Sequence, residues 1–258
     1  MKIWHNDRLV DHLEMPPAGA AWLMGDGAFE TIRTYSGVPF ALERHLKRLN
    51  ESLIHLVITP INGNLICEAV REVIAANPAE PYGRLRISIF SDGELVVTHV
   101  PFSEVIEDAS LAKYPQVKNS TYSIAKTKSS SYAENFRALR MAKQRGFTDA
   151  LFVNERNEVV ESALANVIYL QNDEWLTPEL ESGCLPGVTR ALLIENFGVR
   201  ESVLREPDLA ACQAVAVISS LREIVAVERY ESNLYPSSKQ LRELQASFGN
   251  WIRDSISL

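Results

Sequence analysis

Two lysines, Lys126 and Lys128, are the side chains in this sequence best suited to covalent chemistry. They share strand parity in a segment with a half-buried pattern, and Lys128 directly precedes the serines that open an expected helix. A lysine near a helix N-terminus and a low-dielectric cleft has its ammonium form disfavoured, which is the condition for Schiff-base chemistry. Taken alone, however, the pattern favours two solvated lysines at the end of a strand.

Other segments could supply a carboxylate and a phosphate site. Glu161 follows the hydrophobic pair Val159-Val160, and it is either a surface residue at a strand end or a buried acceptor. Residues 185–189 open a helix, and Ser219-Ser220 follows an apolar strand. Helix N-termini and hydroxyl turns both present N–H groups that suit a phosphate. Taken singly, each of these features is ordinary structure.

Several common site types do not fit the sequence. The turn Gly25-Asp26-Gly27 lacks the spacing of a nucleotide-binding loop and is typical of a tight turn before a strand. The histidines have no ligand spacing, so we expect no metal site. The three cysteines are far apart without CxxC spacing, which indicates reduced thiols rather than disulfides or zinc ligands.

The composition indicates a globular protein that avoids nucleic acid and membranes. The 258 residues are 46% hydrophobic, enough for a substantial core in one large or two medium domains. A formal net charge of -7 repels nucleic-acid phosphates and anionic lipid. The first ten residues lack the apolar core of a secretory signal, and no span reaches the roughly 18 apolar residues that cross a bilayer. We therefore expect cytoplasmic residence.

The first hundred residues alternate strand and helix signals, as in an α+β unit. For example, Leu85, Ile87 and Ile89 alternate with polar residues, which predicts a strand ending at an Asp92-Gly93 turn. The expected strands cover residues 28–35, 84–91 and a further stretch ending at 102, and the expected helices cover residues 42–53 and 65–74.

The pattern weakens from residue 103 to residue 120, and we place a domain boundary there. This gives an N-terminal α+β domain of residues 1–112 and a C-terminal domain of residues 113–258, with a cleft between them. Residues 121–128 are predicted to form a strand that runs into a helix, with a capping box at Ser131 and Glu134 and a stop at Gly146. Further strands are expected at residues 150–153, 159–160, 167–170 and 214–218.

Together and in this order, six segments resemble the class IV aminotransferases, which are fold-type IV pyridoxal-phosphate (PLP) enzymes. The family includes branched-chain and D-amino-acid aminotransferases and 4-amino-4-deoxychorismate lyase. The matching segments are GDGAFETIRTYSG at 25–37, LERHLKRL at 42–49, KSSSY at 128–132, VVESALANVIYL at 159–170, LPGVTR at 185–190 and SSLREI at 219–224. The resemblance implies a small N-terminal α/β domain, a larger strand-rich C-terminal cofactor-binding domain, and an active site between them. It also implies a homodimer whose cleft is completed by the neighbouring subunit.

The resemblance also implies roles for individual residues. Lys128 would carry the cofactor as a Schiff base, because its distance to Gly146 and Glu161 suits the family, whereas Lys126 lies slightly too far upstream and is kept as an alternative. Glu161 would pair with the protonated pyridine nitrogen. The implied phosphate contacts are Arg44, Val188, Thr189, Ser219 and Ser220, and Tyr132 would lie against the cofactor's ring oxygen if a one-residue gap is allowed.

The implied substrate is a small anionic amine. Residues 90–93 lack the arginine and histidine with which D-amino-acid aminotransferases hold a substrate carboxylate, so Arg86, and less directly Arg33 or Arg84, would take that role. The compact length and the SSLREIVAV segment are most similar to 4-amino-4-deoxychorismate lyase, which forms p-aminobenzoate and pyruvate in folate synthesis. A branched-chain or D-amino-acid type aminotransferase is the alternative. A non-catalytic PLP-binding protein is a third reading, which the presence of both the lysine and the glutamate disfavours.

Overall fold

The chain divides into two compact units in the computed structural model, which describes residues 1–14, 21–102 and 108–256. The first unit comprises Met1–Glu104 together with Thr127–Tyr132, and the second comprises Val105–Lys126 and Ala133–Leu258. The predicted boundary after residue 112 differs from this division in two places. The strand that begins at Ala109 belongs to the second unit, and the short segment around Lys128 returns to the first.

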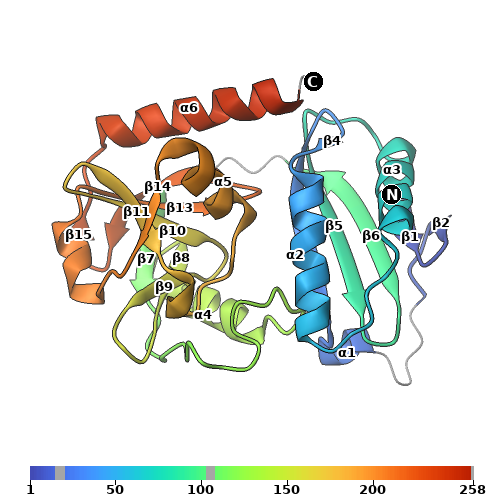
Figure 1. The fold of residues 1–258 in the computed structure, drawn as a ribbon, viewed down its shortest axis with the longest axis horizontal. Helices are drawn as coiled ribbons and strands as arrows, with labels where there is room; N and C mark the ends of the chain where they lie inside the picture. Colours follow the sequence, from blue (N-terminus) through green and yellow to red (C-terminus); the bar gives the residue numbers. More distant parts are fainter. Residues whose placement is uncertain (15–20, 103–107, 257–258) are drawn as a thin grey trace. The chain divides into compact units, whose positions relative to one another are not determined.

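The first unit is built on a six-stranded antiparallel sheet (Figure 1). Across the sheet, the strands are β2 (Arg8–Val10), β1 (Ile3–His5), β6 (Leu95–Pro101), β5 (Tyr82–Phe90), β3 (Gly27–Tyr35) and β4 (Val38–Pro39). The helices are α1 (Ala21–Met24), α2 (Leu42–His55) and α3 (Gly63–Ala76). These bounds confirm the three strands and two helices predicted for the first hundred residues.

The two faces of this sheet have different surroundings because side chains alternate along each strand. On β5, Leu85 and Ile89 are fully buried in a core that also contains apolar residues of α2 and α3. Arg84 and Arg86 alternate with these positions and are exposed. Phe29 on the neighbouring β3 lies on the same face as the two arginines, since its partner across the ladder is an even-numbered residue of β5. The face away from α2 and α3 is therefore cationic, with an aromatic ring beside the charges.

The second unit is built on a mixed nine-stranded sheet. Across the sheet, the strands are β12 (Arg200–Ser202), β11 (Glu174–Pro178), β10 (Asn166–Gln171), β13 (Ala214–Ser219), β14 (Glu223–Tyr230), β7 (Ala109–Lys113), β8 (Asp149–Val153) and β9 (Val159–Ser162), and β15 (Asn233–Leu234) pairs with β14. The helices are α4 (Ala133–Gln144), α5 (Val188–Phe197) and α6 (Lys239–Ile256), with 3-10 turns η1 (Leu180–Ser182) and η2 (Glu206–Ala211). Helices and sheets in both units confirm the predicted α+β class.

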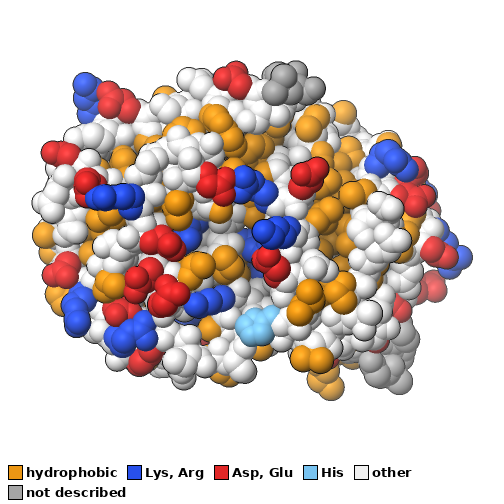
Figure 2. Space-filling view, in the orientation of Figure 1, with side chains coloured by type: hydrophobic (Ala, Val, Ile, Leu, Met, Phe, Trp, Pro, Cys, Tyr) orange, Lys and Arg blue, Asp and Glu red, His pale blue; other side chains and the backbone are white. Residues whose placement is uncertain are grey.

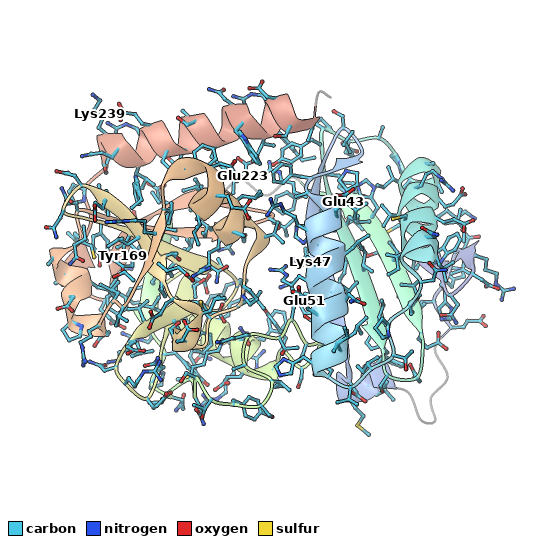
Figure 3. All side chains as sticks on the ribbon, in the orientation of Figure 1. Glu43, Lys47, Glu51, Tyr169, Glu223 and Lys239 are labelled. Atoms are coloured by element: carbon cyan, nitrogen blue, oxygen red, sulfur yellow. The ribbon has the colours of Figure 1, made fainter. Side chains whose placement is uncertain are left out.

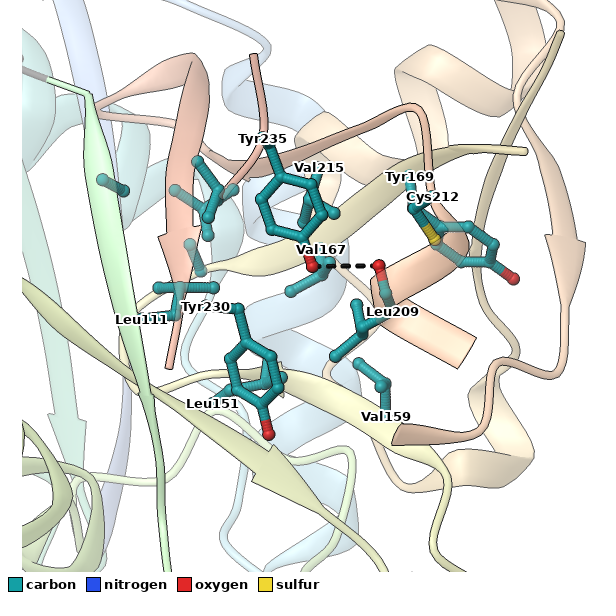
Figure 4. Packing of buried hydrophobic residues seen from close by; sticks show 14 of the residues in the cluster. Leu111, Leu151, Val159, Val167, Tyr169, Leu209, Cys212, Val215, Tyr230 and Tyr235 are labelled. Carbon is teal, nitrogen blue, oxygen red and sulfur yellow. Dashed lines mark hydrogen bonds between the residues drawn. The ribbon is translucent and has the colours of Figure 1, made fainter. Parts of the chain in front are cut away.

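A core of aliphatic and aromatic side chains holds the second unit's sheet together (Figure 4). The Tyr235 hydroxyl donates a hydrogen bond of 3.0 Å to the Leu209 carbonyl, and the Tyr230 hydroxyl donates one of 2.7 Å to Glu206. A buried phenol without such a partner would be costly. These contacts tie the end of β14 and the segment after β15 to η2.

The segment before Lys128 differs from the prediction. Residues 121–126 form turns rather than a strand, with a hydrogen bond of 2.8 Å from the Ala125 N–H to the Tyr122 carbonyl. Lys126 has a φ of 66°, in the left-handed region, which a strand residue does not adopt. The prediction was wrong here because the half-buried pattern does not come from pairing within a sheet. The prediction also missed β7, which lies in the stretch where the sequence pattern weakens.

Charges of both signs lie close together on the surface shown in Figure 2. On α2, Glu43, Lys47 and Glu51 are exposed (Figure 3), and Lys47 and Glu51 form an i,i+4 ion pair at 4.0 Å. Among the residues that the structure describes, no helix combines the length and the apolar character needed to span a membrane.

Candidate active site

Lys128 lies on an extended segment that is hydrogen-bonded to the start of β3. Its carbonyl accepts a hydrogen bond of 3.0 Å from the Phe29 N–H, and the Ser130 N–H donates one of 2.7 Å to the Gly27 carbonyl. The Lys128 N–H donates to the Ser52 hydroxyl on α2 at 3.3 Å. The backbone that carries the candidate lysine is therefore fixed by both a strand and a helix of the first unit.

Lys126 has a different setting. It ends the turn-rich stretch of the second unit in a left-handed conformation, two residues before the segment that joins β3. The structure thus assigns the two lysines to different units, and a cofactor bond at Lys128 rather than at Lys126 stays a prediction.

The Phe29 ring brings two cations and an aromatic side chain together. The Lys128 ammonium lies 4.6 Å from the ring centroid, and the Arg86 guanidinium carbon lies 3.8 Å from it. The Tyr132 ring meets the Phe29 ring edge-on, with centroids 5.3 Å apart. We call these four residues the Phe29 cluster. It places a candidate nucleophile and a candidate anion-binding group against one ring.

The other two predicted substrate arginines lie further along the same sheet face. Arg33 is buried among aromatic rings, with its guanidinium carbon 4.4 Å from the Tyr82 centroid and 5.1 Å from that of Tyr35. Arg84 is exposed and pairs with Arg33 across the β3–β5 ladder. The face thus carries three guanidinium groups, of which Arg86 belongs to the Phe29 cluster.

The predicted phosphate-binding Arg44 is exposed on α2, whereas Arg48, one turn further along, is buried. Arg48 donates two hydrogen bonds of 2.7 Å to the carboxylate of the fully buried Glu30, through Nε and Nη2. The phosphate contact of Arg44 stays a prediction.

A third member completes this buried charged group. His45 Nδ1 lies 2.7 Å from Glu30 Oε2, and neither side chain is exposed. Burial lowers the pKa of His45 and outweighs the opposing effect of Glu30, so the imidazole is neutral. Burial alone would raise the pKa of Glu30, but the charge of Arg48 and the contact with His45 lower it instead. The group is therefore a buried ion pair between Glu30 and Arg48, with a neutral histidine beside it.

Glu161 is a buried carboxylate at the end of β9, which decides between the two readings that the sequence left open. Its Oε2 accepts hydrogen bonds from the Leu185 N–H at 2.9 Å and from the Asn166 amide at 3.4 Å. Its Oε1 forms an ion pair with Lys118. The carboxylate is thus held from three segments of the second unit.

Helix α5 begins beside this carboxylate without a side-chain cap. Its N-cap residue is Gly187, and a Cβ added there would lie 1.9 Å from the Asn166 side-chain oxygen. Glycine is required because Asn166 fills the space that any other side chain would need. Val188 and Thr189, the predicted phosphate contacts, are buried in the first turn of this helix.

The predicted serines lie where β13 turns into β14. The Ser219 hydroxyl accepts a hydrogen bond of 3.2 Å from the Arg222 N–H, and Ser220 follows in the same turn. The Arg222 guanidinium lies 3.4 Å from the fully buried Asp149 on β8. Burial raises the pKa of Asp149, while Arg222 and neighbouring hydrogen bonds oppose that rise. The turn is thereby tied to the start of β8.

Sequence reasoning missed Arg48, Lys118 and Asp149 as residues of interest. Helical spacing could have indicated Arg48, since it shares the buried stripe of α2 with His45. Lys118 and Asp149 meet their partners across 43 and 73 residues of sequence, and no local pattern signals such pairs.

The groups in the two units fit PLP by their chemistry. The first unit offers a lysine amine for the aldehyde. The second offers a buried carboxylate for the ring nitrogen, together with an uncapped helix N-terminus and hydroxyls for the phosphate. In addition, the buried Ser130 hydroxyl, two residues from Lys128, has no hydrogen-bond partner among the described residues. Buried polar groups normally have a partner, so this hydroxyl has a hydrogen bond to offer a polar ligand.

Comparisons with known proteins agree with these features. A model of the family described as Amino-transferase class IV matches residues 27–230. Aminodeoxychorismate lyase from Bacillus subtilis (strain 168) is 29% identical over 213 residues, covering 75% of this chain and 73% of that protein. Branched-chain-amino-acid transaminase 1 from the same organism is 25% identical over 250 residues, which cover 82% of this chain and 70% of that protein. A PLP-bound structure of a hypothetical aminotransferase from Mycobacterium tuberculosis has a TM-score of 0.89 at 22% identity and covers 98% of both chains.

The chain belongs to the class IV aminotransferases, and it is a PLP-dependent enzyme with the fold-type IV architecture. The predicted family, fold, cofactor and enzymatic nature are therefore confirmed.

Proposed function

We propose that this protein is a PLP-dependent 4-amino-4-deoxychorismate lyase that forms p-aminobenzoate and pyruvate. The observation that carries the proposal is the Phe29 cluster, in which Lys128 and Arg86 lie against one aromatic ring at 4.6 and 3.8 Å. A reactive amine and an anchor for a carboxylate are the two groups that an anionic amine substrate needs. The similarity to the Bacillus subtilis lyase supports the same reaction.

Lys128 would act twice in this reaction. It would hold the cofactor covalently until the substrate amine displaces it, and its freed amine would then remove the proton from the ring carbon that bears nitrogen. Loss of that proton leads to expulsion of the neighbouring enolpyruvyl oxygen. The elimination is strongly downhill because it makes the product ring aromatic.

Glu161 would accept the N–H of the cofactor's pyridine ring. When bound, PLP supplies an electron sink for the charge left by the removed proton, and this sink depends on a protonated ring nitrogen. A buried carboxylate held by the Leu185 N–H and by Asn166 has a fixed position for that contact. The Val188 and Thr189 backbone, Ser219, Ser220 and Arg44 would hold the phosphate.

The cationic sheet face supports the lyase over a branched-chain aminotransferase. Aminodeoxychorismate carries two carboxylates, whereas a branched-chain amino acid carries one carboxylate and an apolar side chain. Arg86 would bind one carboxylate, and Arg33 or Arg84 on the same face would bind the other.

An aminotransferase is the second candidate, and the 25% identity to a branched-chain transaminase favours it. The two functions differ in one requirement. A transaminase passes its amino group to a keto acid and stops when none is supplied, whereas the lyase regenerates its starting form without an acceptor.

The deciding experiment gives the purified PLP-loaded protein aminodeoxychorismate without any keto acid. We expect continuous formation of pyruvate and p-aminobenzoate in equal amounts. No turnover of aminodeoxychorismate together with rapid exchange between an amino acid and a keto acid would reject the lyase in favour of the transaminase. Bound cofactor with neither reaction would indicate a non-catalytic protein.

Borohydride reduction followed by peptide mapping tests the lysine assignment separately. We expect the reduced cofactor on Lys128 and an unmodified Lys126. The reverse result would overturn the assignment without deciding between the two reactions.

We further propose a cytoplasmic homodimer, on the basis of the family resemblance and the spacing of the cysteines. Sedimentation velocity of the PLP-loaded protein tests the dimer, and a monomer at micromolar concentration would contradict it.

A further inference from the structure

The ion pair between Lys118 and Glu161 lies within the second unit and is set by fixed backbone. Lys118 follows β7, and its N–H donates a hydrogen bond of 2.9 Å to the Val153 carbonyl at the end of β8. Glu161 lies on β9, one residue before its end, and β9 pairs with β8. The loop that carries Lys118 is thus bonded to the end of β8, the neighbour of β9, and the two side chains meet although 43 residues separate them in sequence.

The two oxygens of the Glu161 carboxylate have different partners. Oε1 faces the Lys118 ammonium, while Oε2 accepts from the Leu185 N–H at 2.9 Å and from Asn166 at 3.4 Å. Asn166 is itself fixed, because its amide also donates to the Leu185 carbonyl at 2.8 Å. Neutral N–H donors thus orient Oε2, and the positively charged Lys118 ammonium contacts Oε1.

Lys118 is the only cation within ion-pair distance of Glu161 among the residues that the structure describes. Its ammonium also lies 4.9 Å from the Phe152 ring centroid, and its side chain is about one-fifth exposed, at 21%. Burial raises the pKa of the nearby Cys184 thiol to about 11, so this neighbour stays uncharged at neutral pH. The charge on Glu161 is therefore balanced by one lysine in a largely water-excluded setting, where a charge pair interacts strongly.

We propose that Lys118 is a positioning residue that keeps the Glu161 carboxylate ionised, so that the proton shared between Glu161 and the cofactor's pyridine nitrogen stays on the nitrogen. This inference rests on the contact between Glu161 and the ring nitrogen in the proposed function. It does not depend on which substrate the enzyme takes.

The physical reason is a competition for one proton. A buried carboxylate without a counter-charge holds a proton more tightly than one beside an ammonium group. Removing the Lys118 charge therefore moves the proton from the ring nitrogen toward Glu161. The cofactor would then lose the positive ring charge on which its electron-withdrawing power depends.

The test uses the PLP-loaded protein, with the cofactor labelled with 15N at the ring nitrogen, and three variants. Lys118→Gln removes the charge but keeps an N–H donor, and Lys118→Arg keeps the charge. Lys113→Gln is the matched control, because Lys113 forms an ion pair with Glu206 on the same unit at 3.1 Å with 42% of its side chain exposed. The readouts are the 15N chemical shift of the bound cofactor, its dissociation constant, and kcat and KM.

We expect Lys118→Gln to move the 15N resonance toward the unprotonated value and to lower kcat by about 10- to 100-fold, by analogy with residues that support metal ligands. KM should change little. Lys118→Arg should restore the wild-type 15N shift, and Lys113→Gln should leave it in place. If Lys118→Gln lowers the melting temperature but leaves both the 15N shift and kcat unchanged, Lys118 is a structural residue only and the proposal is wrong.

The Glu161→Gln variant separates this inference from the proposed function. In that background the further change Lys118→Gln should have no additional effect on the 15N shift, because the carboxylate through which Lys118 acts is gone. A Glu161→Gln protein with an unchanged 15N shift would instead show that Glu161 does not contact the ring nitrogen, which is a failure of the proposed function. If Lys118→Gln does not bind cofactor, the 15N shift of Lys118→Arg decides: a shift toward the unprotonated value despite retained charge contradicts the proposal, and a wild-type shift supports it.

Discussion

The guanidinium carbon of Arg86 lies 3.8 Å from the centroid of the Phe29 ring, across the β3–β5 ladder. A guanidinium stacked on a ring face keeps its N–H groups in the plane of the fork, where they can bind a carboxylate. The same ring contacts the Lys128 ammonium at 4.6 Å. One phenylalanine ring thereby contacts both the candidate base and the candidate substrate anchor.

Arg86→Gln should raise KM for the anionic substrate by about 10- to 100-fold, because a charge-assisted bond to a carboxylate contributes about 1.5–3 kcal/mol. The dissociation constant of the cofactor should not change. Steady-state kinetics and a cofactor titration measure the two effects. Arg71→Gln, at an exposed arginine of α3, is the control, and an equal KM effect there would contradict the anchoring role of Arg86.

Arg44→Gln tests the predicted phosphate contact. If the Arg44 guanidinium binds the phosphate, the variant should weaken PLP affinity by at least about tenfold, because a bidentate contact to a phosphate is lost. Unfolding should be unaffected, since the side chain is exposed. The PLP affinity of Arg44→Gln is compared with that of Arg48→Lys, which changes the buried arginine of the same helix. Loss of PLP affinity in Arg48→Lys with none in Arg44→Gln would move the phosphate contact to Arg48.

The sequence predicted the fold well where one physical rule decides the local structure. Leu85 and Ile89 alternate with arginines on β5, and a strand with one buried face requires that alternation. The strand prediction was wrong for the segment ending at Lys126. Its turns are set by a local hydrogen bond and a left-handed residue, which the side-chain pattern does not encode.

The candidate site was only partly predictable for a similar reason. Helix α2 buries His45, Arg48 and Leu49 at helical spacing, so the pattern could have indicated that Arg48 requires a buried partner, although Arg48 was not among the predicted site residues. The partner itself, Glu30, lies on β3, and only the fold brings it within 2.7 Å. Lys118 lies in a loop with no periodicity, so its contact with Glu161 could not be predicted.

Gly187→Ala should destabilise the second unit and weaken cofactor binding. The added Cβ would lie 1.9 Å from the Asn166 oxygen, and Asn166 cannot yield without losing its bonds to Glu161 and to the Leu185 carbonyl. Such overpacking costs about 1–3 kcal/mol. Thermal unfolding with and without PLP measures it. Gly249→Ala on α6 is the control, since its Cβ would meet only the Arg253 side chain at 3.7 Å, and it should be neutral or slightly stabilising. Equal melting temperatures for the two variants would contradict this account of Gly187.

Glu30→Gln should lower the stability of the first unit by about 3–5 kcal/mol at pH 7, because it leaves the buried Arg48 without a counter-charge. The loss should depend on pH in a defined direction. Arg48 and His45 hold the pKa of Glu30 in the folded protein below its ordinary value of 4.5, so the carboxylate stabilises the fold fully above that value. As the pH falls below 4.5, Glu30 becomes protonated in the unfolded chain but stays ionised in the folded chain. The stabilisation by the carboxylate is therefore lost progressively.

The gap in unfolding free energy between wild type and Glu30→Gln should therefore be constant from pH 7 to about pH 5.5 and narrower by roughly 1 kcal/mol at pH 4. Urea unfolding followed by tryptophan fluorescence, to which the buried Trp4 of this unit contributes, measures the gap at each pH. Glu51→Gln on the exposed side of α2 is the control, since its ion pair with Lys47 at 4.0 Å lies in solvent, and it should show a small effect without this pH dependence. Burial lowers the pKa of His45, so its protonation is disfavoured as the pH falls. A gap that stays constant down to pH 4, or that widens, would mean that Glu30 is not the ionised partner of Arg48.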